Sequence, residues 1–308
     1  MKKRKILLTG AFKYAKEQLE AIAELGFEVE YIQDERVKLP ESYFAVDSVV
    51  GNQIFLYNDI AKFKNLRYIQ LSSVGTDRVP IAYIKEHKIT LKTAGDVYSI
   101  PMAEWVIGKI LELYKHSYEF FKAQQKQAWI KDRNIVELSG KKAAIIGFGN
   151  VGREIAKRLK PFNVQILAVS PRANNADYFD AYYPVAEIEA ALQESDIVIL
   201  TLPLNADTKH LFNDERFAAM KSGGIFINVS RGGIVDETAL SNALNSGKIS
   251  GAALDVFETE PLPQDSPLWH RDNLIITPHN AFVSENNAER LFRLIYENLK
   301  EEIAGTEG

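Results

Sequence analysis

Three polar side chains in the last third of the chain combine residue types that serve acid–base chemistry. Arg231, Glu260 and His279 each follow a predicted buried strand, and the carboxyl ends of parallel strands meet at one edge of a sheet. An imidazole exchanges protons near neutral pH, and a neighbouring carboxylate holds its tautomer and favours its protonated form. A guanidinium offers a rigid fork to a carboxylate and the oxygen beside it. Taken singly, these residues would suit a surface ion pair, a loop carboxylate and a turn histidine, so the hypothesis needs all three to face one crevice.

A glycine-rich segment in the middle of the chain has the spacing of a phosphate-binding turn. It follows the strand predicted at Ala143–Ile146 and opens the helix predicted at Val151–Leu159. In such a turn the first glycine permits the sharp bend, the second lets backbone approach a pyrophosphate, and the third lets helix and strand pack closely. The helix N-terminus offers unpaired N–H groups and a partial positive charge to the phosphates. The predicted cofactor-binding residues here are Gly147, Phe148, Gly149, Asn150, Val151 and Gly152.

The next predicted strand, Val164–Val169, ends where a dinucleotide-binding sheet usually carries an acidic residue for the adenosine ribose. This chain has Ser170 and Arg172 there, and no carboxylate. An arginine–phosphate contact is charge-assisted and contributes about 1.5–3 kcal/mol, which is more than a tenfold preference. We therefore expect NADP(H) to be favoured, with Ser170 and Arg172 at its 2′-phosphate. NAD(H) is the alternative if Arg172 is only a solvated loop residue.

Short β-rich runs alternate with amphipathic helices along the chain, which is typical of parallel α/β architecture. The first third has a helix predicted at Lys13–Leu25 and strands at Lys5–Leu8, Glu28–Ile32, Ala45–Val50, Arg67–Leu71 and Ile89–Leu91. A long helix is predicted from Ile100 to Phe121, with Pro101 suited to its first turn. Six strands then fit a full dinucleotide-binding sheet: Ala143–Ile146, Val164–Val169, Asp196–Leu200, Gly224–Val229, Gly251–Val256 and Leu274–Thr277. Ser284–Ile303 has helical spacing.

This pattern predicts two doubly wound parallel-sheet α/β domains, with a Rossmann nucleotide domain inserted into a smaller flavodoxin-like substrate domain. The C-terminal helix could return to cover the first sheet. Residues 1–98 and 283–308 would then form the substrate (catalytic) domain, and residues 99–282 the dinucleotide-binding domain.

Composition narrows the function classes further. The chain has 308 residues, a net charge of −4 and no cysteine. The charge gives no reason to expect nucleic acid or an anionic membrane as a partner. No apolar run reaches the ~20 residues that cross a bilayer, and disulfide or thiolate chemistry is excluded. We expect a cytoplasmic protein with no metal site.

Several segments together resemble the D-isomer-specific 2-hydroxyacid dehydrogenase family. The resemblance runs from about Leu66 to Ser284, and the matching pieces are 147–152, 201–204, 228–237, 253–261 and 276–279. It implies an oxidoreductase that moves a hydride between NADP(H) or NAD(H) and a small 2-keto or 2-hydroxy acid. His279 would be the acid/base, Glu260 its carboxylate partner, and Arg231 the clamp for the substrate carboxylate and carbonyl.

The resemblance also implies further binding residues. Asp255 would contact the nicotinamide carboxamide, and the cofactor would be lined by Leu202, Pro203, Thr208 and Val229. Backbone N–H groups of Val74 and Gly75, in the turn Ser72–Asp77, would bind the substrate carboxylate. A hinged cleft and a homodimer built on the nucleotide domain are implied as well, with Trp105–Trp129 in the dimer contact. The main departure from the family is at Ser170–Arg172, which affects the cofactor and leaves the reaction class unchanged.

Two other functions stay open at this point. A nucleotide-sensing, corepressor-like binding protein could keep the same fold and residues, but would bind cofactor without useful turnover. A phosphoglycerate or phosphonate dehydrogenase should carry extra cations near Gly51–Phe55 and Ser72–Asp77, where Arg78 is the only nearby cation. The 2-hydroxy acid used and the physiological direction are not readable from the sequence.

Overall fold

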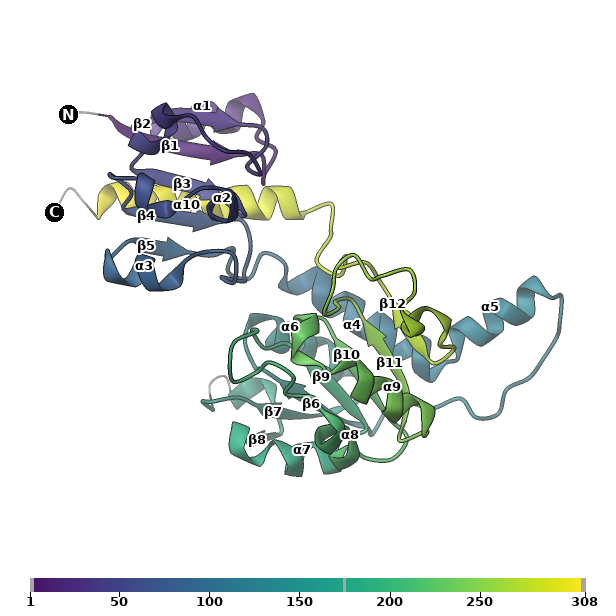
Figure 1. Cartoon of the computed structure of the whole chain (residues 1–308). Helices are drawn as coiled ribbons and strands as arrows, with labels where there is room; N and C mark the ends of the chain where they lie inside the picture. Colours follow the sequence, from purple (N-terminus) through teal and green to yellow (C-terminus); the bar gives the residue numbers. More distant parts are fainter. Residues whose placement is uncertain (1–2, 174–175, 306–308) are drawn as a thin grey trace. The chain divides into compact units, whose positions relative to one another are not determined.

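Two parallel sheets organise the chain in the computed structural model, which describes residues 3–173 and 176–305 (Figure 1). The first unit is formed by the residues up to Tyr98 together with those from Ser284 onward. The second unit is Ser99–Val283, so the second crossing falls one residue later than the 282/283 boundary expected from the sequence.

The first unit contains a five-stranded parallel sheet with the order β2-β1-β3-β4-β5. Its strands are β1 (Arg4–Thr9), β2 (Phe27–Ile32), β3 (Ser48–Gly51), β4 (Tyr68–Leu71) and β5 (Thr90–Lys92). Its helices are α1 (Lys16–Glu24), α2 (Ile54–Tyr57), α3 (Ile81–Glu86), α10 (Asn287–Ala304) and the short 3₁₀ turns η1 (Glu41–Ala45) and η2 (Ile60–Lys62). The strand order is that of the flavodoxin-like fold, as expected.

Alternating side chains of these strands build a core on each face of the sheet. On one face Ile6 and Leu8 pack with Ile295 and Leu299 of α10. On the other face Leu7 packs with residues of α2 and α3. Figure 1 shows α10, the yellow helix, lying along this first sheet. The last helix of the chain therefore completes the unit that the first strands begin.

The second unit contains a seven-stranded parallel sheet with the order β12-β11-β10-β9-β6-β7-β8. Its strands are β6 (Lys142–Ile146), β7 (Gln165–Val169), β8 (Ala181–Tyr183), β9 (Ile197–Leu200), β10 (Gly224–Asn228), β11 (Ile249–Leu254) and β12 (Leu274–Ile276). Its α-helices are α4 (Ser99–Tyr114), α5 (Ser117–Gln125), α6 (Asn150–Leu159), α7 (Ile188–Glu194), α8 (Asp214–Ala219) and α9 (Glu237–Asn245). Short 3₁₀ turns are η3 (Lys160–Phe162), η4 (Ala176–Tyr178), η5 (Val185–Glu187), η6 (Gly232–Ile234) and η7 (Pro267–His270).

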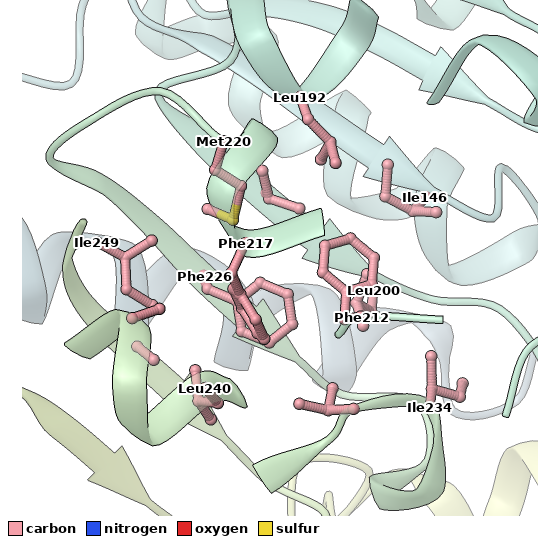
Figure 2. Close-up of a cluster of buried hydrophobic side chains, with 14 of the residues drawn as sticks. Ile146, Leu192, Leu200, Phe212, Phe217, Met220, Phe226, Ile234, Leu240 and Ile249 are labelled. Carbon is pink, nitrogen blue, oxygen red and sulfur yellow. The ribbon is translucent and has the colours of Figure 1, made fainter. Parts of the chain in front are cut away.

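Both faces of this sheet are covered by helices, so its strands are nearly continuous apolar runs. One core, with Phe212, Phe217 and Phe226 at its centre, lies under α7, α8 and α9 (Figure 2). The ring centroids of Phe212 and Phe226 are 5.1 Å apart, as are those of Phe217 and Phe226. The other core lies under α4 and α6. A sheet buried in this way holds its loops on a rigid edge.

Two sequence-based expectations about elements are wrong. The expected long helix to Phe121 is broken, because His116 adopts a left-handed backbone with φ 50° between α4 and α5. A seventh strand, β8, was not expected; it has three residues, all only partly buried, so it carries little apolar signal. Within the described residues, no helix is long and apolar enough to span a membrane, and no cluster of acidic and histidine side chains has the arrangement of a metal site.

Candidate active site

The polar residues singled out in the second unit gather at one edge of its sheet. The glycine turn follows β6, Arg231 follows β10, Asp255 follows β11, and His279 follows β12. All seven strands are parallel, so these positions share the carboxyl edge. The strand order reverses between β6 and β9, which places the glycine turn at the switch point where open α/β sheets bind ligands.

His279 and Glu260 form a hydrogen-bonded pair. His279 Nδ1 lies 2.7 Å from Glu260 Oε2, and the two side chains are 32% and 36% exposed. The carboxylate fixes the ring by accepting from Nδ1–H, which leaves Nε2 for a proton exchanged with a ligand. The ring of Phe282 approaches the imidazole edge-on, with centroids 6.0 Å apart. The pair therefore has the orientation that an acid/base histidine requires.

Electrostatics keep the Glu260 carboxylate ionised. Burial acts to raise its pKa, but hydrogen bonds from His279 and from the Phe257 N–H act against it. The charges of His279 and Arg231 act in the same direction, and the net result is a pKa below the ordinary value. The influence of Arg231 on this carboxylate places the guanidinium in the same electrostatic environment as the pair.

The loop that carries Arg231 is held by a buried amide that the sequence did not single out. Asn228, only 1% exposed, accepts from the N–H and hydroxyl of Ser230 at 3.0 and 2.8 Å. Its amide nitrogen donates to the Arg231 carbonyl at 3.1 Å. Arg231 itself is partly buried, and its guanidinium donates to the Ser230 carbonyl at 2.8 Å. These bonds fix the loop that carries the guanidinium. In the sequence, Asn228 could have been recognised as a polar residue at the end of an apolar strand.

Asp255 organises the turn that presents His279. Its buried carboxylate accepts hydrogen bonds from the Thr277 hydroxyl and from the N–H groups of Asn280 and Ala281, the latter two at 2.8 Å. The His279 N–H donates to the Asp255 carbonyl at 2.7 Å, and His279 has a left-handed backbone with φ 52°. A non-glycine residue in this region costs roughly 1–3 kcal/mol and persists only where its surroundings hold it. Asp255, expected from the sequence at the nicotinamide, thus also has a positioning role that the sequence did not reveal.

The glycine turn fits a dinucleotide pyrophosphate. Gly147 has φ +97°, and a Cβ there would lie 2.7 Å from the Leu202 nitrogen. A Cβ on Gly152 would lie 2.9 Å from the Gly147 carbonyl oxygen, so helix and strand need a glycine at this contact. Gly149 is exposed, and a Cβ there would meet no protein atom within 4 Å. Room for a bound phosphate therefore explains Gly149 better than packing does.

Ser170 and Arg172, the two residues expected at the adenosine ribose, differ in whether a ligand could reach their side chains. Ser170 is 8% exposed and its hydroxyl donates to the Arg172 carbonyl at 2.7 Å. Arg172 is exposed. The serine thus shapes the turn after β7, and Arg172 is the cation that a ligand could reach.

The other residues predicted to bind the cofactor differ in burial: some side chains belong to the core, and others lie nearer the surface. Val229 is 2% exposed and Phe148 7%, and both side chains belong to the core under α4 and α6, so only their backbones can face a ligand. Leu202 is partly buried behind Gly147, and Val151 is partly buried at the start of α6. The Thr208 hydroxyl donates to the Pro203 carbonyl at 2.7 Å and so closes the loop after β9.

In the first unit, the turn after β4 presents two backbone donors. The Ser72 carbonyl accepts from the Tyr98 hydroxyl at 2.5 Å, the Ser73 carbonyl from the Ala94 N–H, and the Gly75 carbonyl from the Ser73 hydroxyl. Burial raises the pKa of Tyr98 to about 12, so its hydroxyl remains a donor. Among the described residues, the N–H groups of Val74 and Gly75 make no hydrogen bond. Two adjacent unpaired N–H groups suit a carboxylate.

Sequence comparisons identify the family to which the chain is similar. Residues 107–281, more than half of the chain, match the NAD-binding domain of the D-isomer specific 2-hydroxyacid dehydrogenases. A glyoxylate reductase of Thermofilum pendens is 36% identical over 241 residues, which cover 76% of this chain and 71% of the relative. A D-3-phosphoglycerate dehydrogenase of Methanocaldococcus jannaschii is 33% identical over 258 residues, which cover 80% of this chain and 47% of the relative. The chain therefore spans about half the length of that relative.

Solved structures are similar over nearly the whole chain. The D-lactate dehydrogenase of Aquifex aeolicus, solved with NAD and lactic acid, superposes with a TM-score of 0.80 at 26% identity and covers 97% of this chain and 96% of that one. A D-isomer specific 2-hydroxyacid dehydrogenase of Xanthobacter autotrophicus Py2, solved with NADPH and MES, also gives a TM-score of 0.80 at 26% identity and covers 98% and 96%. Sequence, fold and site geometry agree: this chain belongs to the D-isomer-specific 2-hydroxyacid dehydrogenase family of oxidoreductases.

Proposed function

We propose that this protein interconverts a small 2-keto acid and the corresponding D-2-hydroxy acid with a nicotinamide cofactor. The observation that carries the proposal is the 2.7 Å hydrogen bond between His279 and Glu260. This pair stands on the same sheet edge as the glycine turn, and Arg231 acts on its carboxylate. An imidazole held in one tautomer, beside a guanidinium, suits a reaction at a carbonyl next to a carboxylate.

Each residue has a separate task in this proposal. When bound, the cofactor supplies or accepts the hydride. His279 donates a proton to the carbonyl oxygen in reduction and takes it back in oxidation, and Glu260 stabilises the protonated ring. Arg231 binds the substrate carboxylate and stabilises negative charge that develops on the reacting oxygen. The N–H groups of Val74 and Gly75 are proposed as further donors for carboxylate binding.

The test is turnover of a 2-keto acid panel with both reduced cofactors. Pyruvate, hydroxypyruvate and bulkier keto acids should be reduced to D-hydroxy acids, identified by chiral chromatography, and glyoxylate to glycolate, which is achiral. A nucleotide-sensing protein would bind NADPH in a fluorescence titration and yet reduce none of them, and that result would refute the proposal.

We propose NADP(H) as the preferred cofactor because Arg172 is exposed after β7 and no carboxylate stands there. The 2′-phosphate contact should give a kcat/KM for NADPH more than about tenfold above that for NADH. Arg172→Ala should remove this preference while leaving the NADH reaction unchanged. A wild-type preference for NADH would contradict this part of the proposal.

We also propose a cytoplasmic homodimer that associates through the second unit. Tyr118, Phe121 and Trp129 are 53%, 55% and 96% exposed, and a single soluble chain rarely exposes so many large apolar side chains close together in sequence. Light scattering should give twice the chain mass, and Trp129→Glu should shift it towards one chain. Val185, 45% exposed on another part of the second unit, is the site of the control substitution Val185→Glu.

A further inference from the structure

Two loops of the second unit, the Arg231 loop (residues 229–236) and the Glu260 loop (residues 255–260), are in backbone contact. They follow β10 and β11, which are paired neighbours in the sheet. Gly232 is buried against the peptide group between Phe257 and Glu258. A Cβ on Gly232 would lie 1.8 Å from the Phe257 carbonyl carbon and 2.4 Å from the Glu258 nitrogen. A glycine at this position is therefore what lets the two loops meet.

The peptide group that packs on Gly232 is also held by a side chain, that of Glu237. This residue is the first of α9 and comes directly after the Arg231 loop. Its Oε1 atom accepts a hydrogen bond from the Glu258 N–H at 2.8 Å. The helix dipole favours an acidic residue in the first turn of α9, but it does not account for a side chain that reaches the next loop. The hydrogen bond thus fixes the orientation of a peptide group whose position the glycine sets.

The charges around Glu237 make this hydrogen bond the interaction that favours its ionised form. Burial raises the pKa of the Glu237 carboxyl, and the negative charges of Glu258 and Asp236 act in the same direction. The Glu258 N–H acts against them, and the net result is a pKa above the ordinary value. The Glu258 carboxylate has a partner of its own, because its Oε1 lies 3.2 Å from His210 Nε2. A half-buried carboxylate beside two acidic residues is better explained by the loop that it holds than by its own contribution to stability.

The segment that Glu237 holds is the one that binds the Glu260 carboxylate. The Phe257 side chain is 6% exposed and anchors this segment in the core under α7, α8 and α9. The Phe257 N–H donates to Glu260 Oε1 at 3.1 Å, and Glu260 Oε2 is the atom that meets His279 Nδ1. Two successive N–H groups, of residues 257 and 258, are thus bound by Glu260 and by Glu237. A displacement of the segment at one of them moves the other as well.

We propose that Glu237 is a positioning residue for the hydrogen-bonded pair of Glu260 and His279. By accepting from the Glu258 N–H, it keeps the Glu260 loop where the carboxylate can orient the imidazole. The inference rests on the proposed function and adds a residue to it. Because Glu237 acts through Glu260, its removal should change kcat and leave cofactor affinity unchanged.

Two substitutions of Glu237 in the full-length enzyme separate the hydrogen bond from the charge. Glu237→Ala removes the acceptor and should lower kcat for hydroxypyruvate reduction by NADPH about tenfold, the smaller end of the effect of losing a supporting partner, since the bond lies near the surface. Glu237→Gln keeps a carbonyl oxygen as acceptor and should recover most of this kcat. The Kd for NADPH, measured by fluorescence titration, should stay close to wild type in both variants.

Asn213→Ala is a control for general loss of stability. Asn213 is the N-cap residue of α8, and its side chain accepts from the Arg216 N–H at 3.1 Å. Loss of this cap should lower Tm to an extent similar to Glu237→Ala. It should leave kcat at the wild-type value, because the contacts of the Glu260 loop are intact. Thermal unfolding of each variant provides the comparison.

A double variant tests whether Glu237 acts through Glu260. Glu260→Ala removes the carboxylate that the loop positions. Adding Glu237→Ala to it should therefore lower kcat far less than Glu237→Ala does in the wild-type background. A residue that only stabilises the fold would lower kcat by the same factor in both backgrounds.

The outcomes separate this role from the proposed function. Equal factors in the two backgrounds, a kcat of Glu237→Ala equal to that of Asn213→Ala, or a Glu237→Gln enzyme no more active than Glu237→Ala would each overturn the positioning role alone. Failure of the wild-type protein to reduce any keto acid would overturn the proposed function and this inference with it.

Discussion

Asp255 in the second unit and Glu35 in the first use one hydrogen-bonding pattern for two purposes. In each, one carboxylate oxygen accepts from a threonine hydroxyl and a backbone N–H, and the other accepts from the N–H of the next residue. Asp255 thereby holds the turn that carries His279, the proposed acid/base. Glu35 holds a loop whose own atoms line a cavity. The comparison teaches that the same hydrogen-bonding pattern of a buried carboxylate can hold either a turn at a sheet edge or the wall of a cavity, depending on the loop that donates to it.

The largest expected effect tests whether the chemistry belongs to the second unit. His279→Ala removes the proposed proton donor, which should lower kcat by about 10²–10⁴-fold. NADPH affinity, measured by fluorescence titration, should stay close to wild type because the glycine turn is intact. Near wild-type kcat would assign the proton transfer to another group.

Arg231→Ala should come next, because the proposed mechanism assigns the guanidinium a part in both substrate binding and rate. We expect KM for the keto acid to rise and kcat to fall about 10²–10³-fold, as for the loss of a preorganised donor at a developing oxyanion. Arg231→Lys keeps the charge without the planar fork and should recover only part of the activity. A change in KM alone would limit Arg231 to substrate binding.

The two glycines of the cofactor turn give a matched contrast. Gly149→Val places atoms in the space assigned to the pyrophosphate, so the Kd for NADPH should rise more than about tenfold with little change in Tm. Gly147→Ala, at φ +97° and against Leu202, should instead lower Tm. Unchanged cofactor affinity in Gly149→Val would remove the pyrophosphate from this turn.

Replacing the buried carboxylates of Asp255 and Glu35 with amides tests the comparison between the two units directly. An amide turns one acceptor oxygen into a donor that faces N–H groups, which should lower the free energy of unfolding by about 1–3 kcal/mol in both variants. Asp255→Asn should lower kcat, roughly tenfold by the usual effect of a lost supporting partner, because it loosens the turn of His279. Glu35→Gln should leave kcat close to wild type, because the loop that it holds carries none of the proposed catalytic residues. Identical kinetic changes in the two variants would contradict the division of tasks.

The smallest expected effect concerns pH. The pKa of the Glu260 carboxyl is lower in the folded protein than its ordinary value. The ionised carboxylate therefore stabilises the fold fully at pH values above the ordinary pKa, and this stabilisation is lost as the pH falls through the lowered pKa. Glu260→Gln should therefore make Tm less dependent on pH in the acid range. Matching pH profiles for the two proteins would show that the pair is not coupled.

Local patterns were enough to predict the framework of both sheets. Buried parallel strands are continuous apolar runs, and the roles of Gly147 and Gly152 follow from the turn geometry that their spacing requires. The tight turn at Gly147 and the close helix–strand contact at Gly152 are confirmed by the structure. These features depend on residues near one another in the chain.

Features that depend on distant partners were not predictable. The apolar pattern continues through Lys115 and His116, so nothing local signals the break between α4 and α5; His116 Nδ1 is instead 2.6 Å from Asp132 Oδ2. The groups that donate hydrogen bonds to the Asp255 carboxylate are at least 22 residues further along the chain. Glu35 likewise meets its partners only after the strands are assembled. A carboxylate in a loop looks the same in sequence whether it is solvated or buried.

The return of α10 to the first sheet has a consequence for biosynthesis. Ribosomes deliver β1 early and α10 last, at about 5–20 residues per second, so the whole second unit emerges between the two parts of the first. Until then Ile6 and Leu8 lack the side chains of Ile295 and Leu299 that cover them. The first unit can therefore be completed only after the second has been synthesised, and one face of its sheet stays partly uncovered until then.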